Sequence, residues 1–513
     1  MWLILLLVLA IVFIILSTSV FKWHPFLSLI IAAFGFGIFS GTLSLTDVVT
    51  AVNSGFGNTI GYIGIVILAG SIIGKFLEKS GGAFKLATSA LKIVGKNNMP
   101  LAMSIVGYIV SIPVFCDSAF IVLSPLSKAL ARTVKISFAV MAMSLSLGLF
   151  ITHHLIPPTP GPVAAAGILE ADLGTVILLG LPVSLVGLII AWLFSIKYAK
   201  KFSIGIDGNL GLNHETNASK GSDAFEKGEE GNDINGQSHK GKYNTDQDLN
   251  SDSDVRIGET ITPDVRPGTG KQDNYIDQEN SIDFFEEGPS LLKSLLPIFI
   301  PIILIILRSI NDLPSAPFGS GIPAMIIGFV GQPSVALMLG VGLSFLLPVK
   351  FSKDMLSASG WLGEGIVAAA TIIIVTGSGG AFGKVLQESG IAEVVKENLA
   401  GAQSLGIWLP IIIAMSLKIA QGSGTVSIIT TASLMAPLVP SLGMDSPSAR
   451  ALVVVAIGAG SMIASHANDS YFWVVTQMSN MTVNQGYRLQ TIGTLILGIC
   501  TSLVVYIMSL WIL

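Results

Sequence analysis

The chain contains few charged residues and almost no cysteine. Only 12% of its 513 residues are Asp, Glu, Lys or Arg, whereas soluble proteins carry about 25%. Its two cysteines, Cys116 and Cys500, give no basis for a disulfide framework or a thiolate metal site. By contrast, 51% of the residues are hydrophobic and the mean hydropathy is +0.74. This composition predicts a polytopic membrane protein.

The few charges are distributed unevenly. Between Phe202 and Gly288 lie 19 of the 32 acidic residues but only 7 of the 28 basic ones. This stretch is rich in Asp, Asn, Ser and Gly, so it cannot bury enough surface to fold alone. We therefore expect three parts: a first transmembrane repeat at 1–199, an acidic disordered linker at 200–289 and a second transmembrane repeat at 290–513. Nothing in the charge pattern indicates a nucleic-acid partner.

Apolar runs of spanning length occur in both parts. The first run lacks a basic n-region and a cleavage site, so we interpret it as a spanning helix rather than a signal peptide. Residues 82–96 carry interleaved lysines and predict an interfacial amphipathic helix. The predicted spans of the first part are Trp2–Val20, Pro25–Gly41, Ile60–Leu77, Ile136–Leu155 (broken by the prolines that follow) and Thr175–Phe194. The apolar runs of the second part are Leu291–Leu307, Gly319–Gly331 (short and interrupted), Pro333–Pro348, Gly365–Leu386, Ala449–Ser465 and Thr491–Leu513.

The two transmembrane parts are copies of each other. Gly74–Gly81 reads GKFLEKSG, and 309 residues later Gly383–Gly390 reads GKVLQESG. The same offset, with small gaps, aligns Pro113–Asp117 with Ser423–Ser427 and His153 with His466. Duplicated halves of this length are typical of secondary transporters, whose sites form between discontinuous helices.

The number of crossings predicts the orientation of the copies. If Pro100–Leu130 is a re-entrant hairpin, the first part crosses the membrane five times, so the second part is inverted. The fold expected is thus all-α, with two inverted repeats of about five spans plus a re-entrant hairpin each. Lysines and arginines in the first repeat gather on one face, which predicts that the linker is cytoplasmic.

Lys418 lies 11 residues into the apolar run Ile407–Leu438. At 1.5 Å per residue it sits about 16 Å deep, near the midplane of a roughly 30 Å hydrocarbon core. A charge there costs roughly 2.5–3.5 kcal/mol, so we expect it to be functional, as the partner of an anionic solute. The alternatives are a lysine that snorkels to the interface or an internal ion pair with Asp117 or Asp469.

Small polar residues follow this lysine and interrupt the same run. Glycines let a backbone approach a ligand closely, and a helix starting after them would point its positive N-terminus at a carboxylate. A flexible, water-facing loop is the alternative. We predict substrate-binding residues at three interruptions. They are Lys418, Gln421, Gly422, Ser423, Gly424, Thr425 and Ser427 in this one, Ser111 and Ser118 in the matching interruption Ser111–Ser118, and Asn468 in a later one.

Four titratable residues lie at the same interruptions. Buried carboxylates and histidines at membrane depth mark proton pathways, so we predict proton-coupling roles for Asp117, His153, His466 and Asp469. Asp117 could instead cap a half-helix. The sequence has no recognisable catalytic dyad or metal-ligand spacing, so we expect no enzyme, no cofactor and no metal.

Three motifs resemble those of the gluconate permease family of bacterial proton symporters. They are His153–Ala166 (HHLIPPTPGPVAAA), Lys418–Thr425 (KIAQGSGT) and Ser465–Trp473 (SHANDSYFW). This resemblance covers nearly the whole membrane part and implies proton-coupled uptake of gluconate or a related sugar acid across the bacterial cytoplasmic membrane. It also implies inverted repeats with paired re-entrant hairpins.

Other functions stay open on the sequence alone. A sodium-coupled carboxylate carrier or a cation/proton antiporter is the main alternative, and a membrane-embedded enzyme is a remote one. The expected partners are a small anionic solute, protons and the lipid bilayer, and the sequence leaves open a homo-oligomer.

Overall fold

The computed structural model describes residues 2–95, 98–204, 288–313, 317–319, 321–391, 393–394 and 405–513. Every regular element among them is helical, which confirms the all-α prediction. In this part of the chain, six single helices are long and apolar enough to span a membrane, and one bent helix pair would make a seventh. Except for its ends, the predicted linker 200–289 lies outside the described residues.

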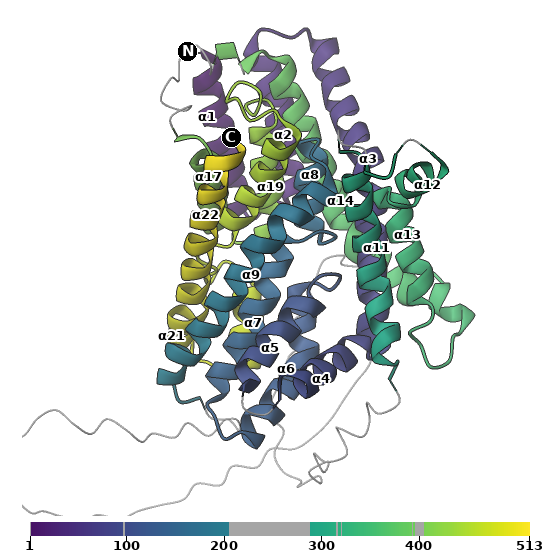
Figure 1. Ribbon diagram of the computed structural model, residues 1–513. Helices are drawn as coiled ribbons and strands as arrows, with labels where there is room; N and C mark the ends of the chain where they lie inside the picture. The colour runs from purple at the N-terminus through teal and green to yellow at the C-terminus, as the bar shows by residue number, and fades with distance from the viewer. Residues whose placement is uncertain are drawn as a thin grey trace, which may run out of the picture. The chain divides into compact units, whose positions relative to one another are not determined.

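The first half runs from α1 to α9 (Figure 1). Its helices are α1 (Trp2–Ser19), α2 (Pro25–Ser40), α3 (Leu45–Lys79), α4 (Gly82–Val94), α5 (Met99–Val110), α6 (Cys116–Thr133), α7 (Phe138–Leu155), α8 (Pro160–Ile168) and α9 (Leu173–Lys197), followed by a 3-10 turn at Ala199–Lys201.

The second half has the corresponding series. Its helices are α11 (Leu291–Asn311), α12 (Ile322–Val330), α13 (Pro333–Ser344), α14 (Trp361–Glu388), α17 (Trp408–Gln421), α18 (Gly424–Met435), α19 (Pro447–Ser461), α20 (Ser470–Met478), α21 (Val483–Gly486) and α22 (Ile492–Ile512), with a 3-10 turn at Lys353–Leu356 and a π-helical turn at Tyr487–Thr491. Helices α12 and α13 are bent by 70° relative to each other and form a broken pair.

The repeated sequence motif folds the same way in both halves. Helix α3 ends in Ser80, whose hydroxyl donates to a backbone carbonyl, and Gly81 follows with φ +78°. Helix α14 ends in Ser389 with the same kind of bond, and Gly390 follows with φ +74°. A left-handed residue just after a helix favours glycine, so the two Ser-Gly pairs terminate equivalent helices.

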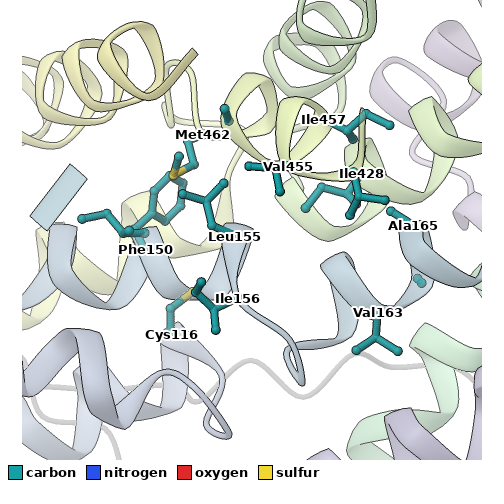
Figure 2. Packing of buried hydrophobic residues seen from close by; sticks show 14 of the residues in the cluster. Cys116, Phe150, Leu155, Ile156, Val163, Ala165, Ile428, Val455, Ile457 and Met462 are labelled. Atoms are coloured by element: carbon teal, nitrogen blue, oxygen red, sulfur yellow. The ribbon is translucent and has the colours of Figure 1, made fainter. Parts of the chain in front are cut away.

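The two halves interlock through long helices and hairpins. Helices α3 and α14 pack along each other, and a Cβ at Gly55 would collide with the Gly380 carbonyl. The first half has a hairpin of α5 and α6 and a broken span of α7 and α8; the second half has a hairpin of α17 and α18 and a broken span of α19 and α20. The second helix of each hairpin packs on the broken span of the other half, α18 on α8 and α6 on α20. Close approach of this kind needs small residues at the helix crossing. Figure 2 shows buried apolar residues of α6, α7, α8, α18 and α19 gathered in one region.

Figure 1 shows the N- and C-terminal ends towards one end of this bundle. Helix α9 ends, and α11 begins, at the opposite end. This arrangement is compatible with an odd number of crossings in each half. The inversion of the repeats and the cytoplasmic side of the linker stay predictions.

Helix α3 begins much earlier than the predicted span Ile60–Leu77. Its first turns contain Thr46, Asp47, Thr50 and Asn53, which lower the local hydropathy. They are helical because one face, including Val48 and Ala51, is buried where α3 packs on α2 and α14. The expected amphipathic helix after it is present as α4, with one buried apolar face.

Candidate functional site

The second hairpin breaks between α17 and α18. Gly422 ends α17 with φ +82°, and a Cβ there would also collide with the Asn468 backbone. Ser423 is the N-cap of α18, and its Oγ accepts a hydrogen bond from the Val426 amide. The glycine thus permits both the turn and the close approach. The first-turn amides of α18 therefore begin at the break, as expected for an anion-binding helix N-terminus.

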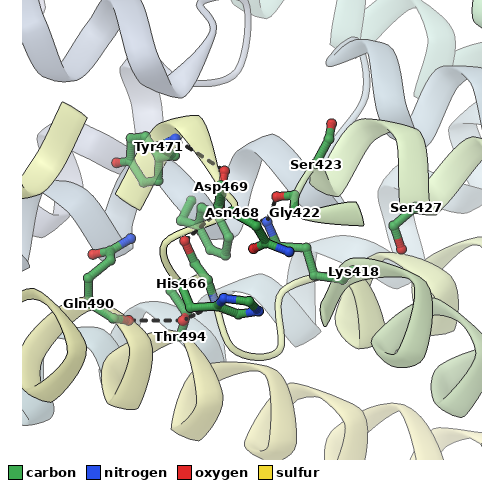
Figure 3. A network of polar contacts seen from close by, with 12 residues as sticks. Lys418, Gly422, Ser423, Ser427, His466, Asn468, Asp469, Tyr471, Gln490 and Thr494 are labelled. Carbon is green, nitrogen blue, oxygen red and sulfur yellow. Dashed lines mark hydrogen bonds and ion pairs between the residues drawn. The ribbon is translucent and has the colours of Figure 1, made fainter. Parts of the chain in front are cut away.

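Lys418 lies in the last turn of α17 and is only 1% exposed. Its Nζ lies 2.6 Å from Asp469 Oδ2 and also donates to the Gly422 carbonyl (Figure 3). The same nitrogen is 5.8 Å from the centre of the Phe150 ring. Of the two internal pairs left open by the sequence, the structure therefore forms the one with Asp469.

Asp469 lies at the break between α19 and α20, and its side chain is 6% exposed. Besides Lys418, its Oδ2 accepts from Ser465 Oγ at 2.5 Å, and its Oδ1 accepts from the Tyr471 amide as the N-cap of α20. Ser465 is itself held by α22, because its amide donates to Thr494 Oγ1. Three donors on one carboxylate fix its position.

His466 and Asn468 join this break to the end of α17. Asn468 Nδ2 donates to the carbonyls of Ile419 and Ala420, and His466 Nε2 lies 3.1 Å from the Ile419 carbonyl. These carbonyls belong to the last helical turn, where backbone acceptors lack intrahelical partners. Both predicted residues therefore tie the two breaks together.

Two side chains at these breaks keep polar atoms without a partner. Asn468 Oδ1 and both polar side-chain atoms of Gln421 are buried and make no hydrogen bond within the described part of the protein. Buried polar groups are normally bonded. Unused donors and acceptors beside an ion pair are what a polar solute would occupy.

The matching break in the first half lies between α5 and α6. Ser111 Oγ donates to the Val114 carbonyl and closes its own turn, and Ser118 is half-buried in the first turn of α6. Asp117 does not cap the helix, because Phe115 occupies the N-cap position. Asp117 Oδ1 is buried without a partner among the described residues. The side chain is therefore available to a proton or a solute hydroxyl.

The vicinal histidines approach the second hairpin from α7. His153 Nε2 lies 3.5 Å from Thr425 Oγ1. His154 Nδ1 is bonded to the Phe150 carbonyl, and a Cβ at Gly424 would collide with the His154 ring. Both histidines are buried. His153, for which the sequence predicted a role, and His154, for which it predicted none, therefore both contact the second hairpin.

A narrow gap, too small to hold a water molecule, lies at the tip of the first hairpin. It is lined by Gly70 and Ser71 of α3, residues 113–115 of the break, His153, and residues 158–160 before and within α8. Ser465 entered the sequence predictions only as the first residue of the Ser465–Trp473 motif, and its bond to Asp469 was not predicted.

The structure brings most of the predicted residues into one region, with two exceptions. Ser427 is fully buried, and its Oγ donates to the Ala414 carbonyl on the other arm of its own hairpin. Ser111 is likewise committed to its own turn. Their contacts support a role in holding the hairpins together. Within the described residues, no three His, Cys, Asp or Glu side chains group as metal ligands.

Comparison with known proteins gives the family. The model of a family described as "GntP family permease" matches residues 2–220 and 264–511 of this chain. The chain belongs to the GntP family of permeases. It is 33% identical to a permease of Haemophilus influenzae over 92% of this chain and 84% of that protein. It is 29% identical to a gluconate permease of Pseudomonas aeruginosa, over 96% of this chain and 94% of that one.

More distant relatives are named for other solutes. In Escherichia coli, a D-serine transporter is 27% identical over 97% of this chain and 96% of that protein, and an L-idonate transporter is 26% identical over 93% and 92%. The fold resembles the Alcanivorax borkumensis YdaH transporter, with a TM-score of 0.61 at 12% identity, covering 95% of this chain and 99% of that one. This GntP-family chain is thus a multi-pass membrane permease and not an enzyme.

Proposed function

We propose that this permease takes up gluconate or a related small hydroxycarboxylate together with a proton across the bacterial cytoplasmic membrane. The names of its relatives support this class of solute: gluconate, L-idonate and D-serine each carry a carboxylate and at least one hydroxyl group. The observation that carries the proposal is the buried ion pair between Lys418 and Asp469.

The charge balance of this pair couples the anion to the proton. Lys418 and Asp469 together are neutral in their ionised forms. A carboxylate entering alone would leave a net negative charge in a buried site, which costs several kcal/mol. A proton entering with it restores neutrality. Binding of the solute anion together with a proton is therefore favoured over binding of either one alone.

The geometry supplies a route for this exchange. Asp469 takes the proton, which ends its ion pair with Lys418. The solute carboxylate then replaces it as the partner of Lys418 Nζ, next to the first-turn amides of α18. Gln421 and Asn468 hold unpartnered polar atoms, and we assign both to solute binding.

Asp117 and the histidines extend the polar path into the first half. His153 contacts Thr425 of the second hairpin, and Asp117 Oδ1 has no partner among the described residues. We assign Asp117 and His153 to proton transfer between the two breaks, and His466 to holding the Asp469 loop on α17. Ser423, Gly424 and Thr425 form the rim of the α18 N-terminus.

Substitution of Lys418 tests the proposal. Lys418→Ala removes the cation and should reduce gluconate uptake in proteoliposomes more than Lys418→Arg, which keeps it. Equal loss in both, with normal protein levels, would mean that the lysine is only structural. Sodium-dependent uptake without proton movement would instead favour the sodium-coupled alternative.

Asp469→Asn separates binding from coupling. Asparagine resembles the protonated carboxyl, so the variant should bind gluconate and exchange it across the membrane without moving protons. Proton uptake unchanged in this variant would contradict the role of Asp469.

A further inference from the structure

We infer that the start of α22 positions Asp469 for its exchange of partners, through two threonines that hold Ser465. Thr491 is the last residue of the π-helical turn, and Thr494 lies in the first turn of α22. Both act on Asp469 through Ser465, so they are positioning residues. This inference rests on the proposed function, in which Asp469 takes the proton, and it assigns a part of that function to a helix outside the two breaks.

Ser465 is bonded through all of its polar groups. Its amide donates to Thr494 Oγ1 at 2.9 Å, and its carbonyl accepts from Thr491 Oγ1 at 2.6 Å. Its own Oγ donates to Asp469 Oδ2 at 2.5 Å. Ser465 and Thr494 are fully buried. Because buried backbone groups need partners, the two threonines fix the backbone of Ser465, and its hydroxyl then fixes the place of Asp469 Oδ2.

The backbone just before Ser465 has an unfavourable conformation. Ala464 has φ +59°, in the left-handed region that residues with a Cβ seldom adopt. Such a conformation persists only where the surrounding structure holds it, and residues of this kind gather at functional sites. The two bonds from α22 to the next residue supply this hold. The threonines therefore maintain a loop conformation that the chain by itself disfavours.

A second chain of bonds connects the other oxygen of Asp469 to the same stretch of α22 (Figure 3). Gln490, fully buried in the π-helical turn, accepts at Oε1 from Ser146 Oγ at 2.8 Å. The Ser146 carbonyl accepts from the Tyr471 hydroxyl at 2.9 Å, and the Tyr471 amide donates to Asp469 Oδ1. Residues 490–494 therefore fix both carboxylate oxygens. π-helical turns are rare and frequently occur at functional sites.

This hold matters for one part of the transport cycle. After the proton leaves, Asp469 must return to Lys418 and displace the solute carboxylate. A carboxylate held by Ser465 is already placed opposite Lys418 Nζ, whereas a loosened one must first be ordered. Exchange of internal for external gluconate needs the anion site at Lys418 but not this return. Loosening Ser465 should therefore impair proton-driven net uptake more than gluconate exchange.

The ratio of these two rates tests the inference. Proton-driven net uptake and gluconate exchange are measured on the same proteoliposomes, so the amount of folded protein cancels. Thr494→Val keeps the shape but removes the hydroxyl, and should lower the ratio about 3- to 10-fold, the effect of one lost hydrogen bond. Thr491→Val should lower it in the same way, and it decides the matter where Thr494→Val does not fold. Thr494→Ser keeps the hydroxyl and should keep the ratio.

Thr501→Val is the matched control. Thr501 is a fully buried threonine of α22, and its Oγ1 donates to the Leu497 and Gly498 carbonyls of its own helix. Thr494 Oγ1 makes the same kind of bond within the helix and also accepts from Ser465. The control variant should therefore leave the ratio unchanged.

Two results would overturn the inference while leaving the transport function intact. One is an unchanged ratio in both Thr491→Val and Thr494→Val. The other is an equal fall in Thr494→Ser, because the hydroxyl would then not be the group that matters. Failure of the unsubstituted protein to take up protons with gluconate would instead contradict the proposed function.

Discussion

Removing one member of the Lys418–Asp469 pair should destabilise the protein, and removing both charges should restore much of the loss. At 2.6 Å, the Coulomb attraction is about 6 kcal/mol for an effective dielectric constant of 20. Desolvation offsets much of this attraction. Truncating one partner of a buried pair nonetheless costs about 3–5 kcal/mol, because the other charge stays buried without compensation.

The assay is chemical unfolding in detergent of Lys418→Met, Asp469→Asn and the double variant. We expect each single variant to lose about 3–5 kcal/mol, and the double variant to lose less than either. Lys384→Met is the control, since its ion pair with Glu388 is about one-third exposed and should contribute about 0–1 kcal/mol. The double variant should remain inactive in transport despite its regained stability.

Gluconate adds a further readout to the same experiment. In Asp469→Asn the lysine lacks its counter-ion, so the solute carboxylate should stabilise this variant more than it stabilises the unsubstituted protein. A double variant no more stable than the singles would refute the energetic coupling. A double variant that still transports gluconate would refute the role of the pair in binding.

Three further substitutions are informative. Gly55→Ala places a Cβ against the Gly380 carbonyl and should lower the free energy of unfolding by about 1–3 kcal/mol. An unchanged free energy of unfolding would mean that α3 and α14 cross less closely than described. Ser465→Ala removes a donor from Asp469 and should reduce gluconate uptake several-fold, whereas normal uptake would make this bond dispensable. Asp117→Asn should change the free energy of unfolding by less than about 1 kcal/mol, since Asp117 Oδ1 has no partner among the described residues, but it should reduce gluconate-driven proton uptake. Unchanged proton uptake would exclude Asp117 from the coupling path.

Much of the architecture follows from sequence because hydropathy and duplication are strong signals. The matching Gly74–Gly81 and Gly383–Gly390 motifs indicated a duplication, and in the structure a helix ends within each motif. The two hairpin breaks were evident from polar residues inside apolar runs, which hydrocarbon does not tolerate. The predicted start of α3 was wrong because polar residues lower the hydropathy of its first turns. One face of these turns is nevertheless buried, because α14 packs on it.

The contacts within the site were harder to predict, because the sequence indicates how deep a residue lies in the membrane but not which neighbours its side chain contacts. Lys418 was recognisable from its position, but its choice of Asp469 over Asp117 depends on how the α19–α20 break folds back onto α17. Ser465 begins a recognisable motif, but its bond to Asp469 depends on how the α19–α20 break folds. The binding and coupling roles of the predicted residues stay predictions until transport is measured.

Proton movement driven by gluconate in proteoliposomes tests the central claim most directly. With a pH-sensitive dye inside and labelled gluconate outside, the exchange of ion partners at Lys418 predicts one proton taken up per anion. The rate should not change when an inside-negative membrane potential is imposed, because the pair moves no net charge. Gluconate uptake without proton entry, or uptake that follows the membrane potential, would contradict the account.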